Sequence, residues 1–316
     1  MIITDLKAQH ISQAQAILRQ NYDAERERVP ALPPSAERPD LTWFANNGFG
    51  VAALEGERLV GFLGWVPPFE NAFRTTDAVG VFSPLGVSGA LGDNRGQIYA
   101  RMYQAAAKKW VKAGALSHAI CLYAHDTEAQ RAFFNYGFGL RCIDAIRPME
   151  EVAAPPCEEY SLRELATEEY GSILPLNKQL NEHMGGSPTF MVYPHITDDV
   201  LRETIQESDA RYFVAERNET PCAYIKVSAD GENFVGRDTG MMHICGAYCL
   251  PEHRGTGLAP SLLNFVIRTL KTEDYTRLGV DFESINPTAA GFWLKYFKPY
   301  THSVVRRIDD FAAAKR

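Results

Sequence analysis

Residues 241–270 read MMHICGAYCLPEHRGTGLAPSLLNFVIRTL, and they predict the central structural unit of the chain. The first nine residues form a β-strand pattern, and the segment 254–259 that follows contains two glycines. Apolar residues then recur at every fourth position: Leu258, Leu262, Val266 and Leu270. That spacing predicts one face of a helix, and Pro260 is tolerated in the first helical turn. The stretch therefore predicts a strand, a tight glycine loop and a helix in direct succession.

The junction between this strand and this helix suits a phosphate group. The first helical turn leaves backbone N–H groups unpaired, and the helix dipole adds partial positive charge there. Gly255 and Gly257 remove side chains that would keep a phosphate away, and Arg254 adds a donor. A pyrophosphate site is therefore predicted, with a plain glycine turn into a helix as the alternative. A G-x-G-x-x-G/A dinucleotide site is excluded because position 260 is proline.

A second segment, NPTAAGFWLKYF at 286–297, follows the predicted strand 277–282. At this point the chain resembles the GNAT superfamily of acetyl-CoA-dependent N-acetyltransferases. That family carries R/Q-x-x-G-x-G/A after its fourth strand, and N-x-x-A-x-x-F-Y-x-K-x-G-F after its fifth. The second motif is matched here by Asn286, Ala289, Phe292 and Lys295. The chain departs from it in having Trp293 at the tyrosine position and Phe297-Lys298 at the Gly-Phe end. The resemblance covers residues 160–308.

The resemblance implies acetyl-CoA as co-substrate and no metal. In the family, the fourth and fifth strands splay apart, and free backbone N–H groups of the fourth meet the acetyl carbonyl and pantetheine. The segment implied for that role here is 247–249, and the phosphate loop follows it. The implied cofactor-binding residues are Ala247, Tyr248, Cys249, Leu250, Arg254, Gly255, Thr256, Gly257, Leu258, Ala259, Asn286 and Trp293.

Two residues are predicted to move protons. His243 lies six residues before Cys249, at a position where some family members place a base, and an imidazole titrates near neutral pH. The alternative is a strand histidine without a role, and Glu216 is a weaker candidate base. Without a strand bulge, His243 and Cys249 would share one face of the strand. Trp293 cannot act as the acid, so Tyr296, about 60° further round the helix, is predicted for that role, with a packing aromatic as the alternative.

The two halves of the chain look alike. Leu6, Ile17 and Leu18 match Leu162, Ile173 and Leu174 at a shift of 156 residues. Arg95, Gly96 and Ala100 match Arg254, Gly255 and Ala259 at a shift of 159. Pro155-Pro156 marks the break between the halves. We therefore predict two tandem GNAT-like domains, 1–150 and 151–316, each a mostly antiparallel twisted α+β sheet flanked by helices.

Each half is predicted to begin with a short strand, at 1–6 and 160–162, and an amphipathic helix, at about 10–22 and about 167–182. A polar excursion follows, at 28–39 and 184–194, and then a hairpin. The hairpins pair 51–54 with 58–65 and 212–216 with 222–228. A further strand, a long helix, a strand, a helix and a closing strand complete each half.

The first half departs from the family pattern at its predicted cofactor loop. Ile98 stands where the loop needs its second glycine, and its branched side chain would crowd a phosphate. In the second motif, Asp126 replaces the asparagine and Phe133 the tyrosine, although the closing Gly137-Phe138 remains. We therefore predict a GNAT-like domain that has lost its cofactor site. Cofactor binding by both halves is the alternative.

Composition excludes several other classes of protein. The 316 residues are 46% hydrophobic with a net charge of −7, which suits a globular chain and argues against a general nucleic-acid binder. No run of 18 apolar residues predicts a membrane helix, and the N-terminus lacks the apolar stretch of a secretory signal. Six scattered cysteines form no CxxC pair, and Cys245 and Cys249 are too far apart on a strand to share a zinc ion. A cytoplasmic protein is predicted.

The predicted reaction is transfer of an acetyl group from acetyl-CoA to a primary amine by direct attack, in the C-terminal domain. An acyl-CoA-binding regulator without turnover is the alternative, because the usual tyrosine is missing. The acceptor would be a small molecule or a peptide, in a cleft beside residues 183–195. His183 and His195 flank that excursion and are predicted to be solvated loop histidines, with contact to the acceptor as the alternative. The sequence sets neither the amine nor the oligomeric state.

Overall fold

The computed structural model describes residues 1–34, 36–76, 78–193, 197–206 and 209–314. The chain forms two compact units. Unit 1 comprises Met1–Asp144 and Pro299–Arg316, and unit 2 comprises Ala145–Lys298. The strand predicted to close the second half therefore lies in unit 1. The domain boundary at 150/151 stays a prediction.

Unit 1 contains a four-stranded antiparallel sheet in the order β1-β2-β3-β5. A second set of strands places β14 antiparallel between β6 and β7, with β4 parallel to β6. The bounds are β1 (Ile2–Asp5), β2 (Gly50–Glu55), β3 (Arg58–Gly64), β4 (Val79–Ser83), β5 (Ser88–Ala90), β6 (Ala115–Tyr123), β7 (Gly139–Pro148, in unit 1 as far as Asp144) and β14 (Thr301–Arg307). The first predicted hairpin is confirmed as β2 and β3.

The helices of unit 1 cover these strands with apolar faces. They are η1 (Ala8–His10), α1 (Ile11–Arg28), α2 (Thr42–Asn46), η2 (Ala72–Arg74), α3 (Arg95–Lys112), α4 (Thr127–Phe134) and α9 (Phe311–Ala314). Helix α1 continues six residues past its predicted end at Tyr22, because polar residues of its last turns are buried with partners. Glu25, for example, is buried, and its carboxylate lies 2.7 Å from His125 Nδ1.

Unit 2 contains a sheet in the order β8-β9-β10-β11-β12. Three of its neighbouring pairs are antiparallel, and β12 runs parallel to β11. The bounds are β8 (Ser161–Glu164), β9 (Arg211–Arg217), β10 (Thr220–Ser228), β11 (Met241–Cys249) and β12 (Arg277–Glu283), with the short β13 (Lys298–Pro299) near the unit's end. The predicted mostly antiparallel α+β architecture is confirmed.

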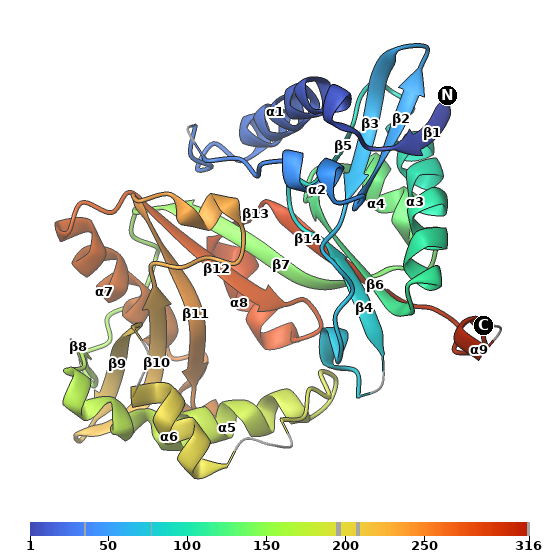
Figure 1. Ribbon diagram of the computed structural model, residues 1–316. Helices are drawn as coiled ribbons and strands as arrows, with labels where there is room; N and C mark the ends of the chain where they lie inside the picture. The colour runs from blue at the N-terminus through green and yellow to red at the C-terminus, as the bar shows by residue number, and fades with distance from the viewer. Residues whose placement is uncertain (35, 77, 194–196, 207–208, 315–316) are drawn as a thin grey trace. The chain divides into compact units, whose positions relative to one another are not determined.

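Helices cover both faces of the unit 2 sheet (Figure 1). They are η3 (Thr167–Ile173), α5 (Leu174–Gly185), α6 (Asp198–Gln206), η4 (Phe234–Arg237), η5 (Pro251–His253), α7 (Leu258–Thr272) and α8 (Pro287–Tyr296). Adjacent residues of β9 point to opposite faces: Tyr212 packs on Tyr170 of η3 at 4.7 Å between ring centroids, and Phe213 meets Phe265 of α7 at 6.1 Å. In the described part of the chain, no helix is long and apolar enough to cross a membrane.

Helix α7 follows the predicted stripe closely. Leu258, Leu262, Val266 and Leu270 are all at most 1% exposed. Their burial against β8, β9 and β10 fixes the N-terminal end of the helix at the end of β11. The fold thereby holds the glycine loop in place, and it is here that the site forms.

Candidate functional site

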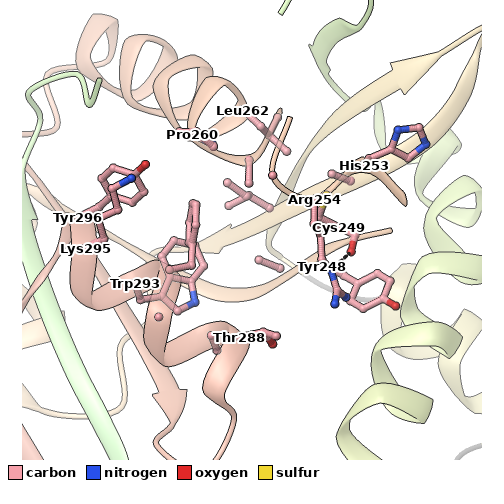
Figure 2. A pocket seen from close by; sticks show the side chains of 18 of the residues that line it. Tyr248, Cys249, His253, Arg254, Pro260, Leu262, Thr288, Trp293, Lys295 and Tyr296 are labelled. Carbon is pink, nitrogen blue, oxygen red and sulfur yellow. Dashed lines mark hydrogen bonds between the residues drawn. The ribbon is translucent and has the colours of Figure 1, made fainter. Parts of the chain in front are cut away.

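A cavity of about 570 Å³ lies in unit 2 where the sheet meets the first turn of α7. Its walls come from the ends of β10 and β11, the loop 253–257, the start of α7, the helix α8 and the last turns of α5. Figure 2 shows Trp293, Lys295 and Tyr296 of α8 on one side of this space, with Tyr248, Cys249 and Arg254 on the other. Tyr248 and Trp293 are buried side chains, so the walls between the polar groups are apolar.

The first turn of α7 presents unpaired amides. Among the described residues, the backbone N–H groups of 255–259 have no acceptor in the protein, and the first amide that is paired is Ser261 N, at 3.1 Å from Gly257 O. Gly255 and Gly257 take the left-handed backbone conformation, with φ of +76° and +92°, which side-chain-bearing residues adopt at a cost. Pro260 has no N–H to leave unpaired. Gly255, Gly257 and Ala259 line the cavity, and unpaired amides at a helix N-terminus favour the binding of an anion.

The strand β11 opens away from β12 beside this loop. Its first four residues, Met241–Ile244, pair with β12, whereas its remaining residues have no partner strand on that side in the described chain. On its other side β11 pairs with β10, with a bulge at Cys245 between Ile244 and Gly246. The opening agrees with the splayed strands that the resemblance implies. It leaves the segment 247–249 with one backbone edge toward the cavity, which Ala247, Tyr248 and Cys249 all line.

Arg254 lies back on the end of β11. Its Nε donates to the carbonyl of Cys249 at 2.9 Å, and its guanidinium sits 5.3 Å from the centre of the Tyr248 ring (Figure 2). This arrangement fixes the base of the glycine loop to the strand. The predicted contact of Arg254 with a phosphate stays a prediction.

The α8 side of the cavity carries a polar cluster. The Asn286 Oδ1 caps α8 by accepting from Ala289 N at 3.4 Å, and it also accepts from the Thr288 hydroxyl at 2.7 Å. His183 Nε2 lies 3.0 Å from Thr288 Oγ1 and 3.3 Å from Asn286 Oδ1. Asn286, predicted to contact the cofactor, thus lines the cavity and also begins the helix.

His183 lies where the sequence pattern did not place it. It was predicted to be solvated in a loop, but α5 continues to Gly185, so His183 falls in a helical turn that lines the cavity. Its helix extends three residues beyond the predicted end at residue 182. Met184 continues the spacing of Leu176 and Leu180, but the run Gly185-Gly186-Ser187-Pro188 directly after it predicts a loop, and this explains why the predicted helix stopped short of His183.

The aromatic residues of α8 form one wall. Trp293 is 6% exposed and lies between Phe292 and Phe297, at ring distances of 4.8 and 5.4 Å. Tyr296 also lines the cavity, and its ring packs on Phe292 at 5.1 Å. The backbone of Tyr296 is held by Arg147, which donates to its carbonyl at 3.3 Å.

His243 does not line the cavity. The side chain is 1% exposed, its Nε2 lies 2.9 Å from Asp281 Oδ1 on β12, and a Cβ on Gly279 would overlap its ring. The condition for its sharing a face with Cys249 fails, because the bulge at Cys245 reverses the alternation along β11. The role of His243 as a base stays a prediction, now without the geometry that motivated it.

Four further predicted residues lie apart from the cavity lining, and a fifth lies outside the described chain. Glu216 accepts two hydrogen bonds from the Arg163 guanidinium, both of 2.9 Å, and does not line the cavity. Leu258 is fully buried, and the Thr256 hydroxyl donates to the His253 carbonyl at 2.8 Å. Leu250 N donates to the Cys222 carbonyl at 2.9 Å. His195 lies outside the described residues.

The thiol that lines the cavity is not poised as a nucleophile. Burial raises the pKa of Cys249 to about 11. Burial also raises the pKa of Cys245, on the same strand. A thiol must ionise to attack or to bind a metal, so both cysteines stay protonated near neutral pH.

The equivalent place in unit 1 is built differently. A Cβ on Gly96 would meet the carbonyl of Glu128 at 3.2 Å, and the rings of Tyr99 and Phe133 lie 5.8 Å apart. Helices α3 and α4 therefore touch near the α3 N-terminus. Arg95 at that end is occupied by an ion pair with Asp126. These contacts support the predicted loss of the cofactor site in the first half.

A model of the acetyltransferase (GNAT) family matches residues 176–297. Among solved structures, a GCN5-related N-acetyltransferase from Sphaerobacter thermophilus is similar at 11% identity over 98% of both chains, with a TM-score of 0.57. A GCN5-related glucosamine N-acetyltransferase region of a fungal GH3 β-N-acetylglucosaminidase is similar at 12% identity, over 96% of this chain and 38% of that one, with a TM-score of 0.52. No curated protein matches the sequence.

The family match and the fold agree on one part of the chain. The matched residues run from α5 to the end of α8 and so include the loop 253–257, the opened strand β11 and the aromatic wall. At identities this low, the two structures show the fold and nothing finer. The C-terminal half of the chain therefore carries the sequence and the fold of the acetyltransferase (GNAT) family.

Proposed function

We propose that unit 2 transfers an acetyl group from acetyl-CoA to a primary amine of a small molecule or a peptide. The observation that carries the proposal is the run of unpaired amides at 255–259, of which those of Gly255, Gly257 and Ala259 belong to residues that line a cavity bordered by the unpaired edge of β11. The amides suit the diphosphate of CoA. The strand edge suits the amide groups of its pantetheine arm, which need backbone partners. Ala247, Tyr248 and Cys249 would then lie beside the thioester.

The residues that line the cavity include a candidate acceptor for the amine proton and a candidate donor for the thiolate proton. Direct attack forms the C–N bond, breaks the C–S bond, releases one proton from the amine and requires one proton for the thiolate. We assign the first proton to His183, whose Nε2 is held by Thr288 and Asn286, which leaves Nδ1 to accept. We assign the second to Tyr296. Backbone N–H groups of 247–249 would stabilise the oxyanion.

A second candidate function rests on Trp293. The buried indole occupies the position where the family motif has tyrosine, and it cannot protonate a thiolate. Unit 2 would then bind an acyl-CoA without turning it over and would act as a regulator. Tyr296 on the same cavity wall favours the enzyme over this alternative.

Calorimetric titration with acetyl-CoA, followed by a screen of primary amines for CoA release, tests both functions. The enzyme requires binding of about one acetyl-CoA per chain and release of free thiol with at least one amine. Binding without release across a broad panel of amines and peptides would favour the regulator. A chain that binds no acetyl-CoA would contradict both, and two molecules per chain would contradict the predicted loss of the site in unit 1.

A further inference from the structure

The segment Glu151–Pro155, here called the linker strap, runs along the outside of α7 toward its N-terminus. At its start Glu151 pairs with Arg268 at 3.0 Å. Further along, Val152 exchanges two hydrogen bonds with Asn264, and at its end the Pro155 carbonyl accepts from the Ser261 hydroxyl at 3.3 Å. Later residues of the strap bond earlier residues of α7, so the strap runs antiparallel to the helix. The strap therefore follows α7 over about two turns.

Asn264 is the main tether of the strap. Its Oδ1 accepts from Val152 N at 2.7 Å and its Nδ2 donates to Val152 O at 2.8 Å. The side chain is 6% exposed and lies on α7 among apolar residues. A buried amide in such a place destabilises a helix unless its hydrogen bonds are made. The ion pair of Glu151 and Arg268 adds little, because both side chains are 52% exposed.

The strap ends against the glycine loop. A Cβ on Gly257 would overlap the Pro155 ring, so this ring lies directly on the residue that precedes α7. Ala153 and Pro155 line the same cavity as Gly255 and Gly257. The cavity thus has an apolar wall next to the unpaired amides, on a segment that is exposed to solvent from outside.

We infer that Ala153 and Pro155 form the wall that receives the nucleoside of the acyl donor, and that Asn264 is the residue that positions this wall. The inference rests on the proposed function. With the diphosphate held at 255–259 and the pantetheine arm along β11, the nucleoside is the remaining large part of the donor. A base and a ribose present flat carbon surfaces, which pack well on a proline ring and a methyl group. Asn264 itself touches no ligand.

The strap assignment is tested with two ligands and two variants. Asn264→Leu fills the same space in an apolar helix face and removes both tether bonds, so the fold should persist while the strap is released. Pro155→Gly removes the ring from an exposed position. The ligands are CoA and 4′-phosphopantetheine, which keeps the pantetheine arm and one phosphate but lacks the second phosphate of the diphosphate and the 3′-phosphonucleoside. Dissociation constants are measured calorimetrically, and thermal unfolding is recorded for each variant.

We expect Asn264→Leu to raise the dissociation constant for CoA at least tenfold and Pro155→Gly at least threefold. Affinity for 4′-phosphopantetheine should stay within twofold of wild type. Asn264→Asp keeps the acceptor for Val152 N but loses the donor, so its effect on CoA should be intermediate. Lys271→Ala, on α7 beyond the strap, is the control and should change neither ligand.

Two results would overturn the assignment. Unchanged CoA affinity in both strap variants would show that Ala153 and Pro155 make no contact with the nucleoside. Equal losses for both ligands would show that the strap acts through the diphosphate loop and not on the nucleoside. Either result leaves the proposed function intact, because wild-type protein would still bind CoA. Wild-type protein that binds neither ligand would contradict the strap assignment and the proposed function together.

Discussion

Gly255 is the residue at which the diphosphate site can be tested most cleanly. Its φ is +76°, and a Cβ there would meet no atom of the protein within 4 Å, although the residue lines the cavity. A methyl group would therefore intrude only on a ligand. We expect Gly255→Ala to raise the dissociation constant for acetyl-CoA at least tenfold, at a cost in folding stability of about 1–2 kcal/mol from the left-handed backbone. Calorimetry and denaturant unfolding measure the two effects.

Gly92 supplies a matched control for this substitution. Its φ is +75°, and a Cβ there would also meet nothing within 4 Å, but the residue lies in unit 1, outside the cavity lining. Gly92→Ala should lose similar stability and leave acetyl-CoA affinity unchanged. Equal affinity losses in the two variants would mean that backbone strain, not the ligand, explains the Gly255 result. Gly257→Val is a poorer test, because its side chain would meet Pro155 first.

His118 makes unit 1 sensitive to acid. Burial lowers the pKa of His118 to about 4. Arg306 donates to the Tyr103 hydroxyl at 3.3 Å, which leaves that hydroxyl to donate to His118 Nδ1 at 2.9 Å. Nε2, 3.1 Å from the Ala115 carbonyl, then carries the proton. The neutral imidazole makes both bonds. A second proton, on Nδ1, would remove the acceptor and break the hydrogen bond from the Tyr103 hydroxyl.

The direction of the pH effect follows from this pKa. The unfolded chain protonates His118 near pH 6.5 and the folded chain only near pH 4, so the unfolded state binds more protons between these values. Stability should therefore fall as pH falls through this window, by about 2 kcal/mol between pH 7.5 and pH 5 from this one group. Urea unfolding of wild type and His118→Phe at both pH values measures the difference. Equal pH dependence in the two proteins would contradict the prediction.

At the scale of elements, the last turn of α5 carries His183, the residue to which we assign the amine proton. His183→Gln keeps an amide that can bond Thr288 but removes the proton acceptor, so we expect kcat to fall about 100-fold. The dissociation constant for acetyl-CoA should stay within twofold. His243→Gln is the comparison, because His243 faces Asp281 away from the cavity, and its kcat should stay near wild type. The reverse outcome would restore the role predicted for His243 from the sequence.

Helix α8 offers the matching test for the acid. Tyr296→Phe removes one hydroxyl and preserves the packing of the ring on Phe292. We expect a fall in kcat of about tenfold or more at neutral pH, with little change in KM. The effect should shrink with increasing pH, because a thiolate product needs its proton less there. Unchanged kcat would leave Tyr296 as a packing residue only.

The sequence predicted some elements well for physical reasons. Helix α7 was recoverable because its apolar stripe is buried residue by residue, and β11 was predicted with its observed bounds. The bulge at Cys245 was not predictable, because a bulge depends on the pairing of β10 with β11 and leaves no periodic trace in one strand. That single extra residue turned His243 away from the cavity. The linker strap was also not predicted, because the sequence around Asn264 gives no sign that its side chain bonds Val152.

At the scale of the whole molecule, the closing strand of the chain completes unit 1. Strand β14 pairs with β6 over all seven of its residues and also with β7. Thr301 is fully buried, and its hydroxyl accepts from Asp144 N at 3.0 Å. Arg306, on the same strand, donates to the Tyr103 hydroxyl that holds His118. The sequence predicted this strand as the last strand of the second half. Its pairing with β6, far away in the chain, leaves no periodic pattern in either strand.

Removal of β14 should therefore unfold unit 1, although unit 1 is encoded mostly at the other end of the chain. A chain that stops at Lys298 leaves β6 and β7 without their shared partner and exposes the edges of both strands. We expect limited proteolysis to cut residues 1–144 rapidly in this chain. A chain that stops at Ile308, just after β14, is the control and should resist as wild type does. Equal resistance of the two truncated chains would contradict the prediction, since unit 1 would then hold its fold without β14.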